Sequence, residues 1–220
     1  MLVSGVDEAG RGSVIGPLVI AGVSIEEKDL PKLVDLGVKD SKLISPKKRE
    51  TLAIYIRELV LNCNVVSLSP FEIDRVVETG KRLHKLNRFE AKAMARVITI
   101  LKPELVYVDA SDVLADRFGK HIAENLDFKL KIVSEHKADL TYPIVSAASI
   151  IAKVERDREI SVLQKKHGNI GCGYPSDPNT IKFLGNWIKK FGSYPDFVRK
   201  SWKTSKRIKR ESDSRQKKLQ

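Results

Sequence analysis

The sequence predicts an α/β protein built on a mixed β-sheet with helices covering both faces. Apolar runs rich in β-branched residues alternate with amphipathic segments along the 220-residue chain. The order is strands first, then strands alternating with helices, then helices alone, which favours a mixed sheet between helical layers. Hydrophobic residues make up 42% and charged residues 31% of the chain. This composition fits a globular protein and excludes wholesale disorder or a fibrous architecture.

Each predicted strand is a short apolar run, and a glycine-rich turn joins the first two. Helix starts carry local signals. Proline follows Ser45 at the first position of one helix, and Ser69 and Glu72 form a capping-box pattern at another. The first half of one long helix is small and apolar all round, which predicts deep burial. We expect strands at 2–7, 14–25, 63–68, 104–109 and 129–134, and helices at 46–61, from 70, and at 87–101, 113–124, 142–166, 179–191 and 195–202.

The chain is predicted to form a core (1–166), a helical C-terminal segment (167–202) and a basic, flexible tail (203–220). The net charge is +12, and the tail, with eight basic and two acidic residues, carries half of it. Such basicity favours a polyanionic partner; the alternative for the tail is a solvated segment that aids solubility. There is no secretory signal and no apolar run of roughly 18 residues that could cross a bilayer. We therefore expect a cytoplasmic protein without a membrane partner.

Carboxylates stand where several predicted strands end. Asp7 and Glu8 close the first strand, Asp109 closes the fourth, and Asp139 follows the fifth. Taken singly, each has an ordinary explanation: solvated turn residues for the first two, an Asx turn for Asp109 and a helix N-cap for Asp139. Their shared position at the rim of a sheet, where sites collect, favours convergence into one site.

Convergence of these carboxylates would cost about 4 kcal/mol of repulsion per close pair at an effective dielectric of about 20. Either their pKa values rise or divalent cations offset the charge. Oxygen ligands suit Mg²⁺ or Mn²⁺ and suit zinc poorly. Two such ions would stabilise the attacking and leaving oxygens of a phosphoryl displacement. The sequence has no P-loop, dinucleotide fingerprint or Cys–His metal spacing, and no GxSxG elbow supports a Ser–His–Asp triad.

Five segments, taken together and in order, resemble ribonuclease HII, and the last resembles the archaeal variety of that family. They are Val6–Gly12 with Gly16-Pro17 following, Lys39–Lys42, Tyr107–Asp109, His136–Asp139 leading into Val145–Lys153, and Gly173–Pro178. The resemblance extends over residues 1 to about 202. It implies a ribonuclease H-like fold, with a five-stranded mixed sheet flanked by helices and a helical C-terminal segment that helps to grip the substrate.

The resemblance also implies an activity. The enzyme would be an endoribonuclease that hydrolyses the RNA strand of RNA–DNA hybrids and incises 5′ to ribonucleotides embedded in duplex DNA. It would use two Mg²⁺ or Mn²⁺ ions and leave 3′-hydroxyl and 5′-phosphate ends. By motif position, the catalytic metal ligands would be Asp7, Glu8, Asp109 and Asp139.

Substrate-binding roles follow from the same resemblance and from the residues themselves. The Gly10-Arg11-Gly12 loop would read the 2′-hydroxyl at the RNA–DNA junction, because glycines let the backbone approach a sugar closely. Tyr174 would pack on the adjacent deoxyribose; the alternative is an ordinary loop aromatic. Other candidates have structural alternatives as surface lysines or helix-packing residues. They are Lys39 and Lys42, for the phosphate backbone, and Ser149 and Lys153, i,i+4 neighbours on the long helix.

Two other functions stay open from the sequence. One is a non-catalytic nucleic-acid-binding protein, against which the four intact acids argue. The other is a different nuclease of the ribonuclease H superfold, such as a resolvase or transposase, which the Gly-Arg-Gly loop and Tyr174 disfavour. Some family members end in a short aromatic motif that binds the sliding clamp. Ser212–Gln220 contains no aromatic residue, so we predict no clamp binding through the tail, and we expect a monomer.

Overall fold

The computed structural model describes residues 1–38, 44–79 and 84–217. Lys39 and Lys42, two predicted substrate contacts, lie outside the described residues. The chain divides into two compact units, each built from three stretches of sequence. The division at residues 166 and 202 that the sequence suggests stays a prediction. The first unit comprises 1–9, 19–67 and 82–155, and the second comprises 10–18, 68–81 and 156–220.

The sheet has five strands in the order β3-β2-β1-β4-β5 and belongs almost entirely to the first unit. β1 pairs antiparallel with β2 and parallel with β4, and β4 pairs parallel with β5. The prediction of a five-stranded mixed sheet is confirmed. Because β1, β4 and β5 run the same way, their C-terminal ends lie at one edge, where the predicted carboxylates stand. The strands are β1 (Leu2–Ala9), β2 (Leu18–Glu26), β3 (Asn62–Leu68), β4 (Leu105–Asp109) and β5 (Lys131–Glu135).

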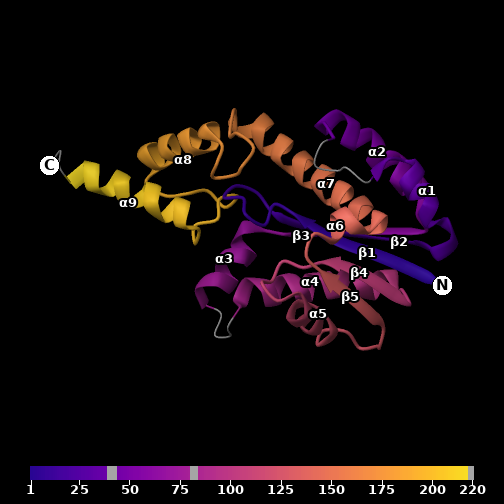
Figure 1. Cartoon of the computed structure of the whole chain (residues 1–220). Coiled ribbons are helices and arrows are strands. Elements are labelled where there is room, and N and C mark those ends of the chain that lie inside the picture. Colours follow the sequence, from indigo (N-terminus) through magenta and orange to yellow (C-terminus); the bar gives the residue numbers. More distant parts are fainter. Residues whose placement is uncertain (39–43, 80–83, 218–220) are drawn as a thin grey trace. The chain divides into compact units, whose positions relative to one another are not determined.

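Helices cover both faces of the sheet in the first unit (Figure 1). One face carries α1, α2, α6 and the first part of α7, and the other carries α4 and α5. None of the helices in the described parts of the chain is long and apolar enough to span a bilayer. The elements are the 3-10 turn η1 (Glu27–Asp29) and the helices α1 (Leu30–Asp35), α2 (Pro46–Leu59), α4 (Lys85–Leu101), α5 (Ala115–Ala123), α6 (Ala138–Thr141) and α7 (Pro143–His167).

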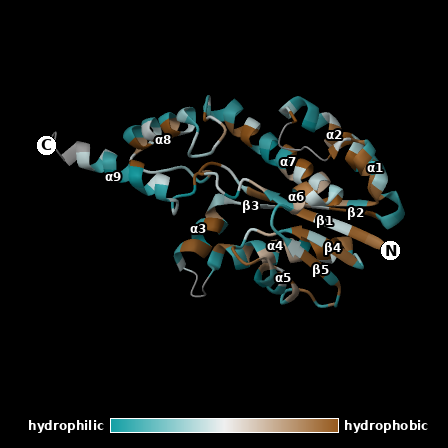
Figure 2. Cartoon of the chain, in the orientation of Figure 1, coloured by the Kyte–Doolittle hydropathy of each residue, from teal (hydrophilic) through white to brown (hydrophobic). Residues whose placement is uncertain are grey.

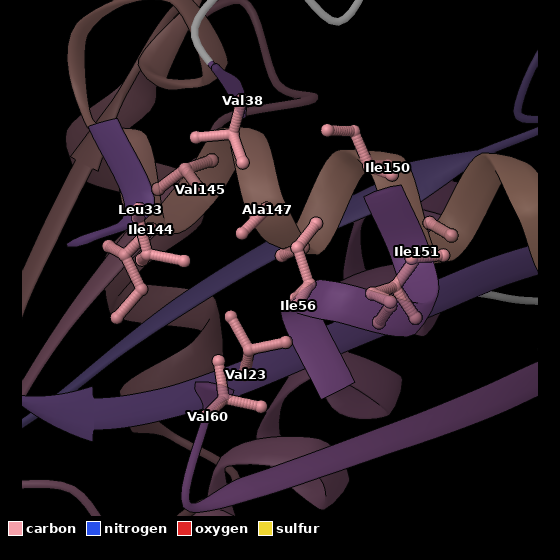
Figure 3. Close-up of a cluster of buried hydrophobic side chains, with 14 of the residues drawn as sticks. Val23, Leu33, Val38, Ile56, Val60, Ile144, Val145, Ala147, Ile150 and Ile151 are labelled. Atoms are coloured by element: carbon pink, nitrogen blue, oxygen red, sulfur yellow. The ribbon is translucent and has the colours of Figure 1, made fainter. Parts of the chain in front are cut away.

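The first half of α7 is the centre of the core of the first unit, as its apolar sequence predicts. Its side chains meet those of β2, α1 and α2 in one continuous apolar cluster (Figure 3). At Gly5 of β1, a Cβ atom would lie 2.4 Å from the backbone carbonyl of Ile144. Glycine therefore lets the start of α7 approach the sheet at backbone distance. The labelled members of the cluster are Val23, Leu33, Val38, Ile56, Val60, Ile144, Val145, Ala147, Ile150 and Ile151.

The second unit has a smaller apolar core, to which residues 10–18, α7, α8 and α9 contribute. In this unit α3 spans Pro70–Thr79 and α8 spans Pro178–Phe191. Asp177 caps α8 by accepting the Asn179 N–H at 2.9 Å. The last helix, α9 (Lys203–Lys217), is mostly hydrophilic (Figure 2) and contributes Ile208 to the core.

The C-terminal region differs from the prediction in two places. Residues 195–202, predicted helical, form turns, because their backbone groups bond to residues 14–16 instead of to their own next turn. Gly16 N–H donates to Phe197 O at 2.9 Å, and Arg199 N–H donates to Val14 O at 2.9 Å. The predicted strand 14–25 accordingly begins at Leu18. Residues 203–217 form α9 where the sequence suggested a flexible tail, since a helix with so few apolar anchors leaves no hydrophobic period to detect.

Candidate functional site

Asp7 and Asp109 lie at the ends of neighbouring parallel strands. Each directly follows the last residue pair of the β1–β4 ladder, so their side chains leave the sheet on the same face. That face is the one covered by α6 and α7. The Asp7 carboxylate is hydrogen bonded to the Ser149 side chain, and Asp109 Oδ1 accepts the Ala138 N–H at 2.9 Å. The two carboxylates are close enough for their charges to interact.

Glu8, the next residue of β1, leaves the sheet on the opposite face, which α4 covers. Ser111 Oγ lies 3.2 Å from Glu8 Oε1 and 3.0 Å from Glu90 Oε1. Glu90 belongs to α4 and is fully buried. The other oxygen of Glu8, Oε2, is buried and accepts no hydrogen bond from any residue that the structure describes. The site therefore includes a fifth carboxylate that the sequence did not reveal.

Asp139 is buried in α6, directly after the residue that binds Asp109. The short helix thus brings the fourth predicted carboxylate beside the end of β4. His136 holds this turn in place, with Nδ1 and Nε2 lying 3.3 and 3.2 Å from two carbonyl oxygens of the loop after β4. The structure therefore places all four predicted acids at the same edge of the sheet.

Burial and charge repulsion raise the pKa values of two carboxyl groups in this cluster. Burial raises the pKa of Asp7 to about 7, the Asp109 charge adds to the rise, and hydrogen bonds from Ser149 and the Glu8 backbone oppose it. Burial also raises the pKa of Glu8 well above its ordinary value, and the charges of Glu90 and Asp7 raise it further. A bound cation would relieve this unfavourable concentration of negative charge.

The donor set fits a hard divalent cation. Carboxylate oxygens are the ligands that Mg²⁺ and Mn²⁺ prefer, and Glu8 Oε2 has acceptor capacity that no described residue uses. Across residues 1–38, 44–79 and 84–217, no three His, Cys, Asp or Glu side chains already form a ligand set. The Asp7 and Glu8 carboxyl groups nevertheless lie within hydrogen-bonding reach of each other, and the charge of Asp109 acts on both.

Ser149 and Lys153 lie one turn apart on α7, as the sequence predicts. Ser149 is buried and supports the Asp7 carboxylate. Ser146, one turn earlier, is also buried and donates to the carbonyl of Val38, so it serves helix packing. Contact of Ser149 and Lys153 with a substrate stays a prediction.

The Gly10-Arg11-Gly12 loop belongs to the second unit, where the buried Arg199 side chain binds its backbone. Arg199 Nη2 donates to Gly10 O at 2.7 Å, Nη1 to Arg11 O at 2.7 Å, and Nε to Gly16 O at 3.2 Å. Gly10 has φ +86°, and a Cβ there would lie 2.7 Å from a backbone oxygen, so the loop itself requires glycine. Gly12 differs, because a Cβ there would meet no atom of the described residues within 4 Å.

Tyr174 lies in the same unit, next to the buried Arg156, whose guanidinium is 4.6 Å from the ring centroid. The preceding residue, Gly173, accepts the N–H groups of Val14 and Ile15 at 2.8 and 3.1 Å. The glycine loop and the Tyr174 segment are therefore joined through backbone hydrogen bonds within the second unit.

Sequence reasoning missed Glu90, Ser111 and Arg156. It treated Arg199 as a possible phosphate contact, whereas the structure buries this side chain. The sequence did carry a signal for Glu90. This residue stands next to Ala91 among the buried, mostly apolar positions of α4, where an acidic side chain is unexpected. Arg199 stands beside Lys200 in a basic stretch, and nothing in its local sequence indicates burial.

Comparisons with known sequences agree on one family. A family model described as Ribonuclease HII matches residues 4–205. A curated protein named Ribonuclease HII, from Thermococcus sibiricus, is 53% identical over 210 residues. The match covers 94% of this chain and 91% of the relative.

Solved structures give the same result for the fold. The crystal structure of ribonuclease H2 from Pyrococcus horikoshii has a TM-score of 0.88 and 44% identity, covering 97% of this chain and 99% of that chain. The PCNA:RNase HII complex from Archaeoglobus fulgidus has a TM-score of 0.84 and 45% identity, covering 94% and 96%. Both likenesses extend over nearly the full chain.

Proposed function

The chain belongs to the ribonuclease HII family, and from this we propose that it incises duplex DNA 5′ to an embedded ribonucleotide. It is a metal-dependent ribonuclease H, an enzyme that acts on RNA–DNA hybrids. The proposal adds the single-ribonucleotide substrate, 3′-hydroxyl and 5′-phosphate products and a two-metal mechanism. In the proposal the enzyme acts as a monomer.

The observation that carries the proposal is the set of acids at the ends of β1 and β4. Asp7, Glu8 and Asp109 act on one another electrostatically, and two of them have strongly raised pKa values. Burying acids together for a purely structural role would cost free energy of folding, whereas bound cations would offset the repulsion between them. We assign these three acids and Asp139 as the residues that would hold Mg²⁺ or Mn²⁺. When bound, two such ions supply charge stabilisation for the attacking and leaving oxygens of the phosphodiester.

The protein's own groups prepare the cluster for this role. Ser149 orients the Asp7 carboxylate by a hydrogen bond, and the Ala138 N–H orients that of Asp109. Burial of Asp7 excludes water from one side of the site and strengthens its electrostatic interactions. Asp139 would complete the ligand set or hold the attacking water.

The glycine loop is the proposed reader of the 2′-hydroxyl. Gly12 supports this role, because neither its backbone conformation nor its neighbours among the described residues require glycine. The need for an unobstructed backbone there would come from a sugar that approaches it. Tyr174, braced by Arg156, offers a flat face to a deoxyribose. The proposal includes no clamp binding through Ser212–Gln220, which lacks aromatic residues.

The test uses a DNA duplex that carries one ribonucleotide, incubated with Mg²⁺ or with EDTA. We expect one cut, 5′ to the ribonucleotide, in Mg²⁺ alone. Asp7→Asn should lower the cleavage rate roughly a thousandfold or more and leave hybrid binding largely intact. Asp35→Asn, at an exposed position of α1, is the matched control and should cut normally.

The other two functions give different outcomes in this assay. A non-catalytic binding protein would retain the duplex without cutting it. A different nuclease of the same superfold would cut without regard to the ribonucleotide. Mg²⁺-dependent cleavage retained by Asp7→Asn would remove the assignment of the carboxylates.

A further inference from the structure

The buried Glu90 carboxylate is joined to Glu8 by a single hydroxyl group. Ser111 Oγ lies 3.0 Å from Glu90 Oε1 and 3.2 Å from Glu8 Oε1. A serine hydroxyl carries one proton, so Ser111 donates to one of the two carboxylates at a time while it lies within reach of both. The remaining Glu8 oxygen, Oε2, accepts no hydrogen bond within the described part of the chain.

Helix α4 holds the loop after β4 at two adjacent points. Glu90 meets Ser111, and Asn87, one turn earlier on the same face of α4, hydrogen-bonds the side chain of Asp112. This loop begins directly after Asp109. The face of α4 that carries Asn87 and Glu90 therefore fixes the loop and, through Ser111, one oxygen of Glu8.

The carboxyl group of Glu90 requires a reason beyond this hydrogen bond. Burying an ionisable group is costly, and a glutamine would also accept a hydrogen bond from Ser111. Among the charged groups around Glu8, Glu90 acts on it most strongly, ahead of Asp7. One more negative charge is unfavourable in an isolated acidic cluster and favourable beside a bound dication.

We propose that Glu90 is a positioning residue of the metal site. Ser111, which lies beside it, donates to Glu8 Oε1 and leaves Oε2 for a divalent cation, and the charge of Glu90 strengthens the grip of the cluster on that cation. The inference rests on the proposed function and adds to it a fifth acid that does not itself touch the metal.

The test is Glu90→Gln, which keeps an acceptor for Ser111 and removes the charge. Mn²⁺ is titrated without substrate and followed by the rise in Tm, since a ligand that binds the folded state stabilises it. The Mg²⁺ dependence of hybrid cleavage is measured in parallel. We expect the half-saturating concentration of both ions to rise roughly tenfold, with the rate at saturating metal within about threefold of wild type.

Ser111→Ala provides a second variant, which keeps the Glu90 charge and frees Glu8 Oε1. It should also raise the half-saturating Mn²⁺ concentration, by less than Glu90→Gln does. Glu124→Gln removes an exposed carboxylate that pairs with Arg88 of the same helix α4, and it should bind Mn²⁺ as wild type does.

Wild-type metal dependence in Glu90→Gln, or in Ser111→Ala should the first variant not fold, would overturn the inference. That result differs from failure of the proposed function, in which wild-type protein itself would show neither stabilisation by Mn²⁺ nor Mg²⁺-dependent cleavage.

Discussion

At the residue scale, Gly10 and Gly12 have different reasons for being glycine. At Gly12 an added Cβ meets open space and the backbone conformation is ordinary. We predict that Gly12→Ala changes the free energy of unfolding by no more than about 1 kcal/mol. The same change should lower cleavage at least about tenfold, because the added methyl group meets the approaching sugar. Denaturant unfolding and single-turnover cleavage measure the two effects.

Gly10→Ala is the contrasting variant. Its φ of +86° and the backbone oxygen that would lie 2.7 Å from an added Cβ should cost about 2 kcal/mol of stability. Equal stability losses in Gly10→Ala and Gly12→Ala would mean that Gly12 serves the fold and not the substrate.

The contribution of the Asp112–Arg117 pair to stability should depend on pH. The Asp112 carboxylate is fully buried and accepts the Arg117 Nε–H at 3.0 Å. This interaction holds the pKa of Asp112 well below its usual range. The folded-state value therefore lies below the unfolded value of about 3.9, so the stabilisation is present above about pH 4 and is lost as the pH falls through the folded pKa.

We expect Asp112→Asn to lower the free energy of unfolding by about 2 kcal/mol at pH 7 and by progressively less below about pH 4. Urea unfolding across that range measures the difference. Asp116→Asn, at an exposed position one turn away on α5, should show no such trend. A penalty for Asp112→Asn that stays constant with pH would assign it to packing and not to charge.

At the element scale, hydrophobic periodicity was sufficient for the sheet and the larger helices. The apolar first half of α7 predicted its own burial, and the strand ends predicted where the acids stand. Elements that depend on distant partners were missed. The 195–202 segment has a helix-compatible sequence, yet its backbone bonds to residues 14–16. α9 is anchored by Ile208 and by Ser205, whose carbonyl accepts the Tyr194 hydroxyl at 3.2 Å.

The same distinction applies to the site. Asp7, Glu8 and Asp109 were predictable because each stands at or near the C-terminal end of a strand, a position that the local sequence reveals. Ser111 was not, and the only signal for Glu90 was an acid on an apolar helix face, because the importance of both comes from a contact between α4 and the loop after β4 that no sequence spacing shows. Family resemblance supplied the roles of the glycine loop and Tyr174, and the chemistry of those residues supports them.

The buried Arg199 of the 195–200 segment stabilises the backbone conformation of the glycine loop. Arg199→Lys retains the charge, but a lysine cannot donate to the three carbonyl groups that Arg199 reaches. We predict a loss of about 3 kcal/mol in the free energy of unfolding and at least about tenfold slower cleavage, with the rise in Tm caused by Mn²⁺ retained. Lys189→Arg, an exposed exchange of the same two residue types on α8, is the control. Normal cleavage by Arg199→Lys would show that the loop keeps its shape without this arginine.

At the scale of the whole molecule, the positive charge is unevenly divided. The second unit holds 20 of the 40 Lys and Arg residues but 9 of the 28 Asp and Glu residues, which gives it +11 of the net +12. The first unit, which carries the acidic cluster, is almost neutral. The acids that would bind cations and most of the net positive charge therefore belong to different units.

A hollow of about 300 Å³ in the second unit is lined by some of these basic residues. It lies along α9, and the cations that line it are Lys200, Lys206, Lys209 and Arg210. Phosphate contacts release counterions, so the logarithm of the hybrid binding constant should fall linearly with the logarithm of salt concentration, by about 0.9 per contact. We predict that changing the three α9 cations of the hollow to Gln makes this slope shallower by up to about 3.

The matched control removes the same charge from the first unit, by changing the exposed Lys120, Lys129 and Lys131 to Gln. Hybrid binding is measured by fluorescence anisotropy in Ca²⁺ or EDTA, so that cleavage does not interfere. If the charge acts through contacts at α9, the slope changes in the first triple variant alone. If it acts as a general field, both triple variants weaken binding alike, because each lowers the net charge from +12 to +9. A slope unchanged in the α9 variant would therefore exclude this helix from the substrate interface.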